Sequence, residues 1–305
     1  MKFSILIPTY NGLAYIEPLF RALRTQTVKP DQVIIVDSSS QDGTVSAILA
    51  HQDAFKIDVK IIPSSEFNHG GTRNFAASFT DSDILVFLTQ DAIPVGPNSI
   101  KNLISRFSDP NVASVYGRQL PYPQHNEISK FLREFNYPPI DASRDLSNFR
   151  EFGIKAFFNS NSFSSYRRSH FFESGTFPSD IIFGEDTILT KKLVESGHKI
   201  IYASDAAVTH SHDYTPWEDF KRYFDLGVCH ALLFQTEDLN RGGDGLKYVL
   251  AQTRWLLGKR AYGLIPVSFI ALFAKWIGYK SGRNYRRVPN WLRRIISMNP
   301  RYWKN

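Results

Sequence analysis

The sequence has almost no cysteine: the single one among its 305 residues is Cys229. One cysteine excludes a disulfide within the chain and a thiolate cluster around a metal, which fits a reducing compartment. We therefore expect Cys229 to be a packed residue rather than a nucleophile. The apolar run at the N-terminal end of the sequence is short as well: it covers residues 2–8 and stops at Pro8. They indicate a first β-strand and not a signal peptide.

Acidic residues are missing from the last part of the chain. Residues 246–305 contain 13 Lys and Arg and no Asp or Glu, whereas the rest of the chain carries 23 basic and 29 acidic residues. Trp and Tyr are interspersed among these basic residues, a combination that suits the headgroup region of an anionic membrane. The alternative is a helical region that packs on the rest of the chain or forms a homo-oligomer. No nucleic-acid-binding module is recognisable, so nucleic acid is not an expected partner.

A long hydrophobic run is absent too. The apolar segment of this tail, residues 264–274, is broken by Lys275. It is shorter than the roughly 20 residues that an ordinary transmembrane helix needs. The tail is therefore expected to dock on a surface rather than to span a bilayer.

The first half of the chain alternates between strand-like and helix-like segments. The strand-like segments are residues 2–8, 32–36, 59–63, 84–88 and 112–117, and the helix-like ones are 13–25, 42–49, 71–78 and 99–107. Such alternation predicts βαβ units around a parallel sheet. Residues 120–150 are rich in Pro, Asn and Asp and are expected to form a long surface excursion.

The second half contains fewer clear signals. Residues 155–166 are expected to be extended, and 185–196 to form a helix that ends at Gly197. Two short strands, 199–203 and 207–209, follow, and from Pro216 the pattern is helical. We place the domain boundary near residue 215.

Four polar motifs follow predicted strands or open a predicted helix. They are Pro8–Gly12, Asp37–Thr44, Thr89–Asp91 and Gly184–Asp186. Each has a plain explanation, since Asn-Gly and Asp-Gly form turns and a carboxylate is favoured at a helix N-terminus. Open α/β folds, however, bind ligands at the carboxyl ends of their strands. The four motifs together therefore point to a ligand site.

The set resembles the family 2 nucleotide-sugar glycosyltransferases. The matching features are Pro-Thr-Tyr-Asn at 8–11, Asp37 in its Val-Asp-x-Ser-Ser-x-Asp-Gly-Thr turn, Asp91 in place of the metal-binding Asp-x-Asp, and Glu185-Asp186 followed by Leu189. The resemblance runs over residues 1–215 and implies an inverting enzyme of the α/β class with a GT-A fold. That fold is a Rossmann-like mixed, mainly parallel sheet flanked by helices. Residues 1–117 would bind the nucleotide sugar, 118–215 would form the acceptor side, and 216–305 the helical extension.

A narrower resemblance concerns the donor sugar. Residues 66–74 and Thr-Gln-Asp-Ala at 89–92 are similar to the branch of bacterial rhamnosyltransferases that use dTDP-L-rhamnose. The resemblance implies donor binding by Thr9, Tyr10, Asn11, Asp37, Asn68, His69, Gly70, Arg73 and Gln90. Asp37 would accept a hydrogen bond from the imide N–H that uracil and thymine have and cytosine lacks. Tyr10 would offer a ring face, and the glycines at 70–71 would let the backbone approach the ligand. Arg73 would lie near the pyrophosphate or the base, unless it is a solvated helix arginine.

The leaving diphosphate calls for a divalent cation, Mn²⁺ or Mg²⁺. Asp91 is the retained acid of the usual pair, and Thr89 stands where the first aspartate normally is. Related enzymes place a metal-binding histidine after the catalytic helix, so His210 is the expected second ligand, with His212 as the alternative. Asp186 would be the base that takes the proton of the acceptor hydroxyl, and Glu185 would hold the acceptor or orient the base.

The resemblance also implies a partner and a place in the cell. The acceptor would be a lipid-linked glycan of a bacterial surface polysaccharide, and the enzyme would lie in the cytoplasm, peripheral at the inner face of the membrane. Two other interpretations stay open. One is a UDP-hexose-dependent enzyme of the same fold, and the other is an inactive relative that only binds nucleotide or glycan, suggested by the missing first aspartate.

Overall fold

The computed structural model describes residues 1–148, 153–233 and 244–303. These residues form two compact units. The first consists of Met1–Leu120, Tyr137–Ser179 and Glu185–His210, and the second of Pro121–Asn136, Asp180–Gly184 and Ser211–Asn305. The domain boundary near residue 215 stays a prediction. So do the roles assigned to residues 1–117, 118–215 and 216–305.

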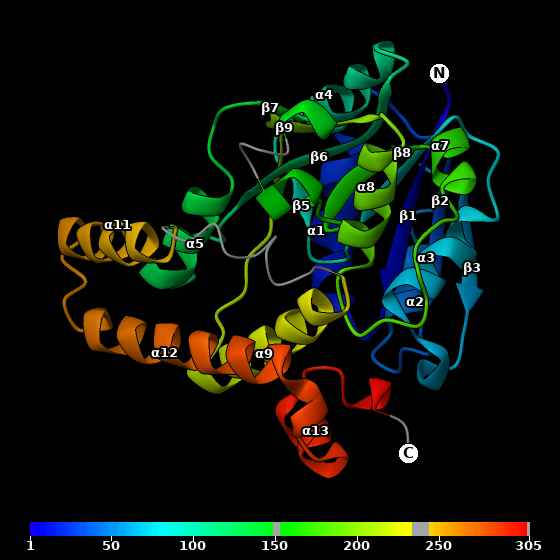
Figure 1. Cartoon of the computed structure of the whole chain (residues 1–305). Helices are drawn as coiled ribbons and strands as arrows, with labels where there is room; N and C mark the ends of the chain where they lie inside the picture. Colours follow the sequence, from blue (N-terminus) through cyan, green and yellow to red (C-terminus); the bar gives the residue numbers. More distant parts are fainter. Residues whose placement is uncertain (149–152, 234–243, 304–305) are drawn as a thin grey trace. The chain divides into compact units, whose positions relative to one another are not determined.

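The first unit is built on one sheet, which has nine strands among the described residues, in the order β3-β2-β1-β4-β8-β6-β9-β5 with β7 paired to β9 (Figure 1). The strands are β1 Phe3–Thr9, β2 Gln32–Asp37, β3 Ile57–Ile61, β4 Ile84–Leu88, β5 Ile93–Pro94, β6 Val112–Leu120, β7 Ala142–Arg144, β8 Phe163–Arg167 and β9 Lys199–Thr209. The four strands from β3 to β4 are parallel, and β8 joins them antiparallel. The parallel sheet predicted from the alternation is therefore confirmed for β1 to β4, and the mixed sheet implied by the family resemblance is confirmed as well.

Helices flank this sheet. They are α1 Leu13–Arg24, α2 Thr44–Leu49, α3 His69–Ala77, α4 Ser99–Ser105, α7 Arg168–Glu173 and α8 Glu185–Glu195, with short 3₁₀ turns at Ser64–Glu66, Arg106–Ser108, Leu146–Asn148 and Gly153–Phe157. Because helices cover the sheet, its strands β1, β2 and β4 are largely apolar. Ile5, Leu6 and Ile7 of β1 are fully buried, as is every residue of β4.

Two local predictions differ from the structure. The segment 155–166 is extended only from Phe163, because a 3₁₀ turn ends at Phe157 and a polar turn follows it. The excursion 120–150 contains α5, Glu127–Asn136, and β7, while Arg150 lies outside the described residues. Helix α5 repeats apolar residues at helical spacing, and the prolines on both sides hide this pattern.

Two strand predictions need smaller corrections. The third strand lies at Ile57–Ile61, two residues earlier than predicted. The two short strands near residue 205 are one strand, β9, whose register with β6 is interrupted between Ala203 and Ala207. A bulge of this kind breaks the regular alternation of residues along a strand, which explains why the sequence pattern stops there.

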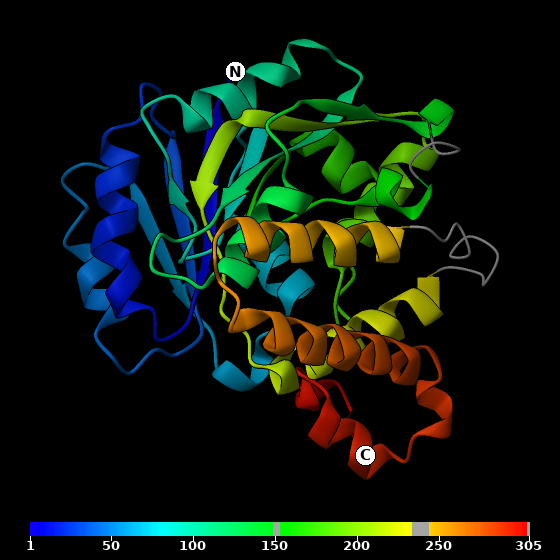
Figure 2. The same cartoon turned by 90° about the vertical axis from the view of Figure 1, so that its left-hand side faces the viewer.

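The second unit is helical. It contains α5, α9 Pro216–Leu233, α11 Asp244–Gly258, α12 Leu264–Arg283 and α13 Asn290–Ile296, with 3₁₀ turns at Tyr285–Arg287 and Pro300–Tyr302. Helices α9 and α12 run side by side (Figure 2). A Cβ at Gly278 or Gly282 would lie 2.3 Å or 2.0 Å from a backbone oxygen of α9, so both positions need glycine. None of the described helices is both long enough and apolar enough to cross a bilayer.

Candidate active site

Parallel pairing brings the first motifs to one edge of the sheet. Thr9 at the end of β1 lies beside Asp37 at the end of β2. Asp37 is fully buried and accepts hydrogen bonds from Thr9 Oγ1 at 2.7 Å, Ser40 N at 2.8 Å and Ser40 Oγ at 2.7 Å. A carboxylate has about four acceptor positions. Asp37 therefore holds its own turn together and keeps room for about one further donor.

Gln90 fixes the loop after β1. Its Oε1 accepts from Tyr10 N at 3.0 Å and its Nε2 donates to Tyr10 O at 3.1 Å. A Cβ at Gly12 would lie 2.2 Å from the same Oε1, so only glycine allows this contact. The Tyr10 ring is 52% exposed, and Asn11 adopts a left-handed φ of 44° while its Oδ1 accepts from Gln41 N. Gln90 thus acts on the loop through the backbone of Tyr10.

The Asn-His-Gly stretch at 68–70 packs against residues 178–179. Asn68 caps α3 by accepting from Gly71 N at 2.7 Å, and its Nδ2 donates to Ser179 O. A Cβ at Gly70 would lie 2.0 Å from the carbonyl oxygen of Pro178. These contacts account for Asn68 and Gly70 without a ligand, so their donor roles stay predictions. The ring of His69 meets Phe67 edge-on.

Arg73 pairs with the predicted catalytic motif. Its side chain is 5% exposed, its Nη1 donates to His69 O at 2.9 Å, and the same atom lies 3.3 Å from Glu185 Oε1. Asn161 Nδ2 donates to the same Glu185 oxygen at 3.1 Å. The alternative of a solvated helix arginine is wrong, because Arg73 lies in a buried ion pair.

The two neighbouring carboxyl groups differ in charge. Burial raises the pKa of Asp186 to about 7, and the negative charge of Glu185 adds to the effect. Asn161 N and Thr187 N donate to Asp186 at 3.3 Å and 2.7 Å and oppose this shift. Burial alone would raise the pKa of Glu185, but Arg73 leads the groups that hold it below its usual value. Pairs whose pKa values are pushed apart are typical of acid–base sites.

The predicted metal ligands in the first unit lie together. Asp91 follows β4, His210 follows β9, and His210 Nε2 lies 3.4 Å from Asp91 Oδ2. His210 Nδ1 lies 2.9 Å from Gln119 Oε1, and Gln119 Nε2 donates to Ser160 Oγ at 2.7 Å. Because the amide nitrogen of Gln119 donates elsewhere, its oxygen accepts from Nδ1–H. This tautomer leaves the Nε2 lone pair on the side of Asp91.

These residues fit a divalent cation. A carboxylate oxygen and an imidazole nitrogen are both ligands for Mn²⁺, and both side chains belong to a group that could hold a metal ion. Thr89 Oγ1 is buried and has no hydrogen-bond partner among the described residues. His212, the alternative ligand, comes two residues after His210 and belongs to the second unit, where its ring stacks on Tyr214.

Gln119, Ser160 and Asn161 are site residues that the sequence analysis missed. Gln119 is a polar residue at the end of the largely apolar strand β6, and Asn159, Ser160 and Asn161 form a polar run before β8. Polar residues at strand ends were the signal used for the other motifs, so the same signal could have found these.

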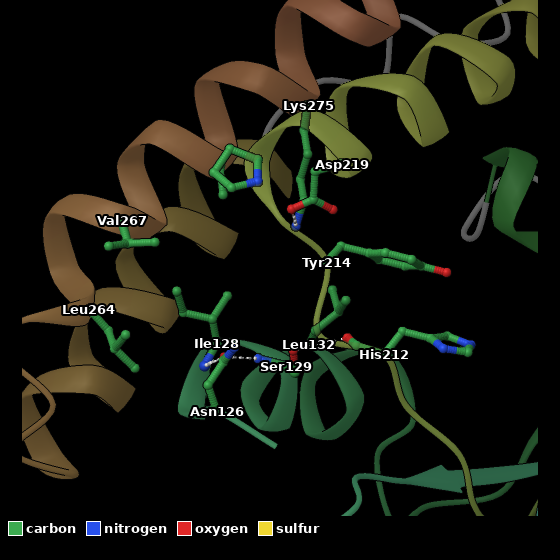
Figure 3. A pocket seen from close by; sticks show the side chains of 12 residues that line it. Asn126, Ile128, Ser129, Leu132, His212, Tyr214, Asp219, Leu264, Val267 and Lys275 are labelled. Carbon is green, nitrogen blue, oxygen red and sulfur yellow. Dashed lines mark hydrogen bonds and ion pairs between the residues drawn. The ribbon is translucent and has the colours of Figure 1, made fainter. Parts of the chain in front are cut away.

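A pocket of about 60 Å³ lies inside the second unit (Figure 3). Helix α12 contributes Leu264 and Val267, and Lys275 lies 3.4 Å from Asp219 in a buried ion pair. Burial raises the pKa of Asp219, and Lys275 opposes the shift. Apart from His212, none of the predicted site residues lines this pocket, so it is not a candidate donor site.

Comparison with known proteins identifies the family. Residues 4–174 match the model of glycosyl transferase family 2. The chain belongs to this family. It is also 42% identical to the O-antigen chain rhamnosyltransferase RfbN of Salmonella typhimurium, over 100% of this chain and 97% of the relative. The O-antigen chain rhamnosyltransferase WbaN of Salmonella anatum is likewise 42% identical, over 100% of this chain and 96% of the relative. The predicted family is confirmed.

Solved structures show the same fold. The mannosyltransferase PcManGT from Pyrobaculum calidifontis, in complex with GDP-Man and Mn²⁺, has a TM-score of 0.60 at 18% identity, over 93% of this chain and 82% of its own. Residues 1–349 of Staphylococcus aureus TarS, in complex with UDP-GlcNAc, have a TM-score of 0.58 at 18% identity, over 94% and 92%. The predicted GT-A fold is confirmed.

Proposed function

We propose that this family 2 glycosyltransferase moves L-rhamnose from dTDP-L-rhamnose to a hydroxyl of a lipid-linked bacterial surface polysaccharide precursor. The observation that supports this reaction is the pair of Glu185 and Asp186. Burial raises the pKa of Asp186, and Arg73 helps to lower the pKa of Glu185. The sugar and the polymer follow from full-length relatives that are named O-antigen chain rhamnosyltransferases.

Asp186 acts as the general base. A sugar hydroxyl must lose its proton as it attacks, and a base with a pKa near the working pH does this best. Burial raises the pKa of Asp186 to about 7, which meets this condition. Glu185 stays anionic beside Arg73 and Asn161, where it holds the acceptor or orients the base. One displacement inverts the sugar and needs no second nucleophile.

Asp91 and His210 would hold a divalent metal, Mn²⁺ or Mg²⁺. When bound, the metal acts as a Lewis acid towards the leaving diphosphate. Gln119 keeps His210 in the tautomer that a metal ligand needs. His212 remains the alternative to His210, because it follows His210 by two residues.

Donor recognition is assigned to the loops after β1 and β2. The remaining acceptor position of Asp37 suits the imide N–H of thymine or uracil, and the exposed ring of Tyr10 suits stacking. Because TarS is described with UDP-GlcNAc, a UDP-hexose is the second candidate donor.

The second unit supports docking on an anionic membrane at the cytoplasmic face. One face of α12 is buried, and the opposite face exposes the large apolar side chains of Phe269, Ile270, Phe273 and Trp276 at helical spacing. Residues 246–305 carry 13 basic side chains and no acidic one. Apolar side chains flanked by basic ones suit a helix that lies in the headgroup region. A homo-oligomer is the alternative use of this face.

A donor screen tests the proposal. Purified protein is heated with dTDP-L-rhamnose, UDP-hexoses, dTDP, CDP or GDP, each with and without Mn²⁺ or Mg²⁺. A ligand that binds the folded state raises the melting temperature, and we expect the largest rise with dTDP-L-rhamnose and metal. Transfer of radiolabelled rhamnose to a lipid-linked acceptor is the direct check. An equal rise in melting temperature with CDP and dTDP would contradict the role of Asp37. A larger rise with a UDP-hexose than with dTDP-L-rhamnose would make the UDP-hexose the donor instead.

A further inference from the structure

Residues 180–184 directly precede the Glu185-Asp186 motif, yet they belong to the second unit. Ile182 is buried in the apolar core of that unit with Phe224, Val228 and Trp303, and Phe183 packs against the same core. The guanidinium of Arg222 lies 5.4 Å from the centre of the Phe183 ring. The chain therefore leaves a well-packed anchor immediately before the proposed catalytic residues.

A buried carboxylate on α9 holds the C-terminal segment to this anchor. Asp225 is 2% exposed. It accepts from Ser297 Oγ at 2.7 Å, Met298 N at 3.0 Å, Asn299 N at 3.1 Å and Asn299 Nδ2 at 3.1 Å. Two backbone N–H groups and two side chains of one three-residue segment thus share a single acceptor. Hydrogen bonds to a charged group of this kind are stronger than those between neutral groups.

Asn299 joins this cluster to the catalytic turn. The same Nδ2 that donates to Asp225 also lies 3.2 Å from the carbonyl oxygen of Ile182 and donates to it. Two residues later, Gly184 has a φ of 82°, and a Cβ there would lie 2.8 Å from Cys229 Sγ. Asn299 of the C-terminal segment therefore holds the backbone of Ile182, and Cys229 of α9 leaves no room for a side chain at Gly184.

We propose that Asp225 and Asn299 are positioning residues, which hold the turn at residues 182–184 and thereby set the direction in which Glu185 and Asp186 leave it. The proposal rests on the proposed function, because it assigns a catalytic use to that direction. Asp225 and Asn299 touch no reacting atom, and they act through the peptide chain that links Ile182 to Glu185. It follows that the C-terminal segment, far from the motif in sequence, is needed for turnover and not for donor binding.

A purely structural role would lower stability without a selective effect on turnover. Burial raises the pKa of Asp225 to about 6, so at neutral pH it is charged, and the donors facing it compensate that charge. Removing Asp225 takes away the acceptor of Ser297 Oγ and Met298 N, so we expect Asp225→Ala to destabilise the fold strongly. Asn299 is partly exposed, so Asn299→Ala removes the link to Ile182 at a smaller structural cost.

The experiment compares full-length Asn299→Ala with Asn284→Ala. Asn284 is a matched control, because its Nδ2 also donates to a backbone carbonyl of the second unit, that of Lys280, and does not contact the turn. Rhamnosyl transfer is measured as kcat and donor KM, and hydrogen exchange follows the amides of residues 182–187. For Asn299→Ala we expect kcat to fall about tenfold, the donor KM to stay within about twofold, and exchange to become faster, since small misplacements of reacting groups cost this much. Asn284→Ala should resemble the wild type.

Two results would overturn the proposal. One is unchanged exchange at residues 182–187 in Asn299→Ala, which would mean that Asn299 does not hold the turn. The other is faster exchange with an unchanged kcat, which would mean that the turn needs no such support. A wild-type chain that transfers no sugar would refute the proposed function instead, and the exchange data would still decide whether Asn299 anchors the turn.

Discussion

His210 Nδ1 lies 2.9 Å from Gln119 Oε1, and this contact turns the other ring nitrogen towards Asp91. The two residues are 91 positions apart in the chain and meet because β6 and β9 are paired in parallel, with Leu120 beside Thr209. Partners of a metal-binding histidine fix its tautomer and its orientation. Gln119 is therefore as much a part of the proposed metal site as the ligands themselves.

The first prediction concerns Gln119. Gln119→Ala should weaken Mn²⁺ binding about 10- to 100-fold, because a histidine without its partner samples other orientations. Calorimetric titration of Mn²⁺ in the presence of nucleotide measures the effect. Gln32→Ala is the matched control, since the Gln32 amide also donates to a carbonyl within the first unit, that of Phe79, and should leave Mn²⁺ affinity unchanged. An unchanged affinity in Gln119→Ala would remove Gln119 from the metal site.

The second prediction separates the metal from the base. Asp91→Asn should weaken metal-dependent nucleotide binding and lower the rate, and His210→Ala should do the same more mildly, because a water can replace the imidazole. Asp186→Asn should abolish transfer and leave nucleotide affinity nearly unchanged, since the change is almost isosteric and removes only the proton acceptor. Rates and nucleotide affinities are measured for all three variants. Near-normal transfer by Asp186→Asn, or metal dependence untouched in Asp91→Asn, would show that the assigned roles are wrong.

The third prediction is a pH dependence of the rate. Burial raises the pKa of Asp186 to about 7, and only the ionised carboxylate can accept a proton. The value of kcat/KM should therefore rise with pH and level off above an apparent pKa near 7. That pKa belongs to the coupled pair with Glu185. A rate that is already maximal at pH 5 would argue against Asp186 as the base.

Stability should change with pH in the opposite direction. The pKa of Asp186 is raised from 3.8 to about 7 in the folded chain, so between these values the folded state binds more protons than the unfolded one. The contribution of Asp186 to the free energy of unfolding is thus fully present below about pH 4 and is lost as the pH rises through 7. Asp186→Asn removes this loss. Its advantage in unfolding free energy over the wild type should grow from pH 4 to pH 8, by about 4 kcal/mol at most, since one pKa unit corresponds to about 1.4 kcal/mol. Denaturant titration at several pH values measures it, and a constant difference would contradict the raised pKa.

The sequence predicted the features that depend on local pattern. Strands of a parallel sheet end at one edge, so the motif at Thr9 and the turn at Asp37 could be brought together before the structure was known. The amphipathic helix that begins at Glu185 was also readable from its spacing. The prolines around α5 concealed its apolar repeat, which is why that helix was missed.

Other features depend on three-dimensional contacts that no local pattern encodes. The resemblance places Arg73 near the pyrophosphate or the base, and the structure adds a partner that the sequence does not indicate, Glu185, in a buried ion pair. Gly70 is expected to allow a close approach of the ligand, and in the structure the carbonyl of Pro178 makes a close approach there. An arginine indicates a charged contact and a glycine a close one, but the sequence does not indicate which residue is the partner.

The last prediction concerns the exposed face of α12. Phe273 is 61% exposed and lies in the region that has no acidic residue, so Phe273→Ser should weaken binding to liposomes that contain anionic lipid. Ile140→Ser is the control, because Ile140 is 70% exposed but belongs to the first unit. It should bind liposomes as the wild type does. Binding is measured by cosedimentation at low and high salt, and it should fall as salt rises, because exposed charges are screened. If the wild type ignores anionic liposomes at low salt but sediments as a dimer that Phe273→Ser dissociates, this face is a subunit contact instead.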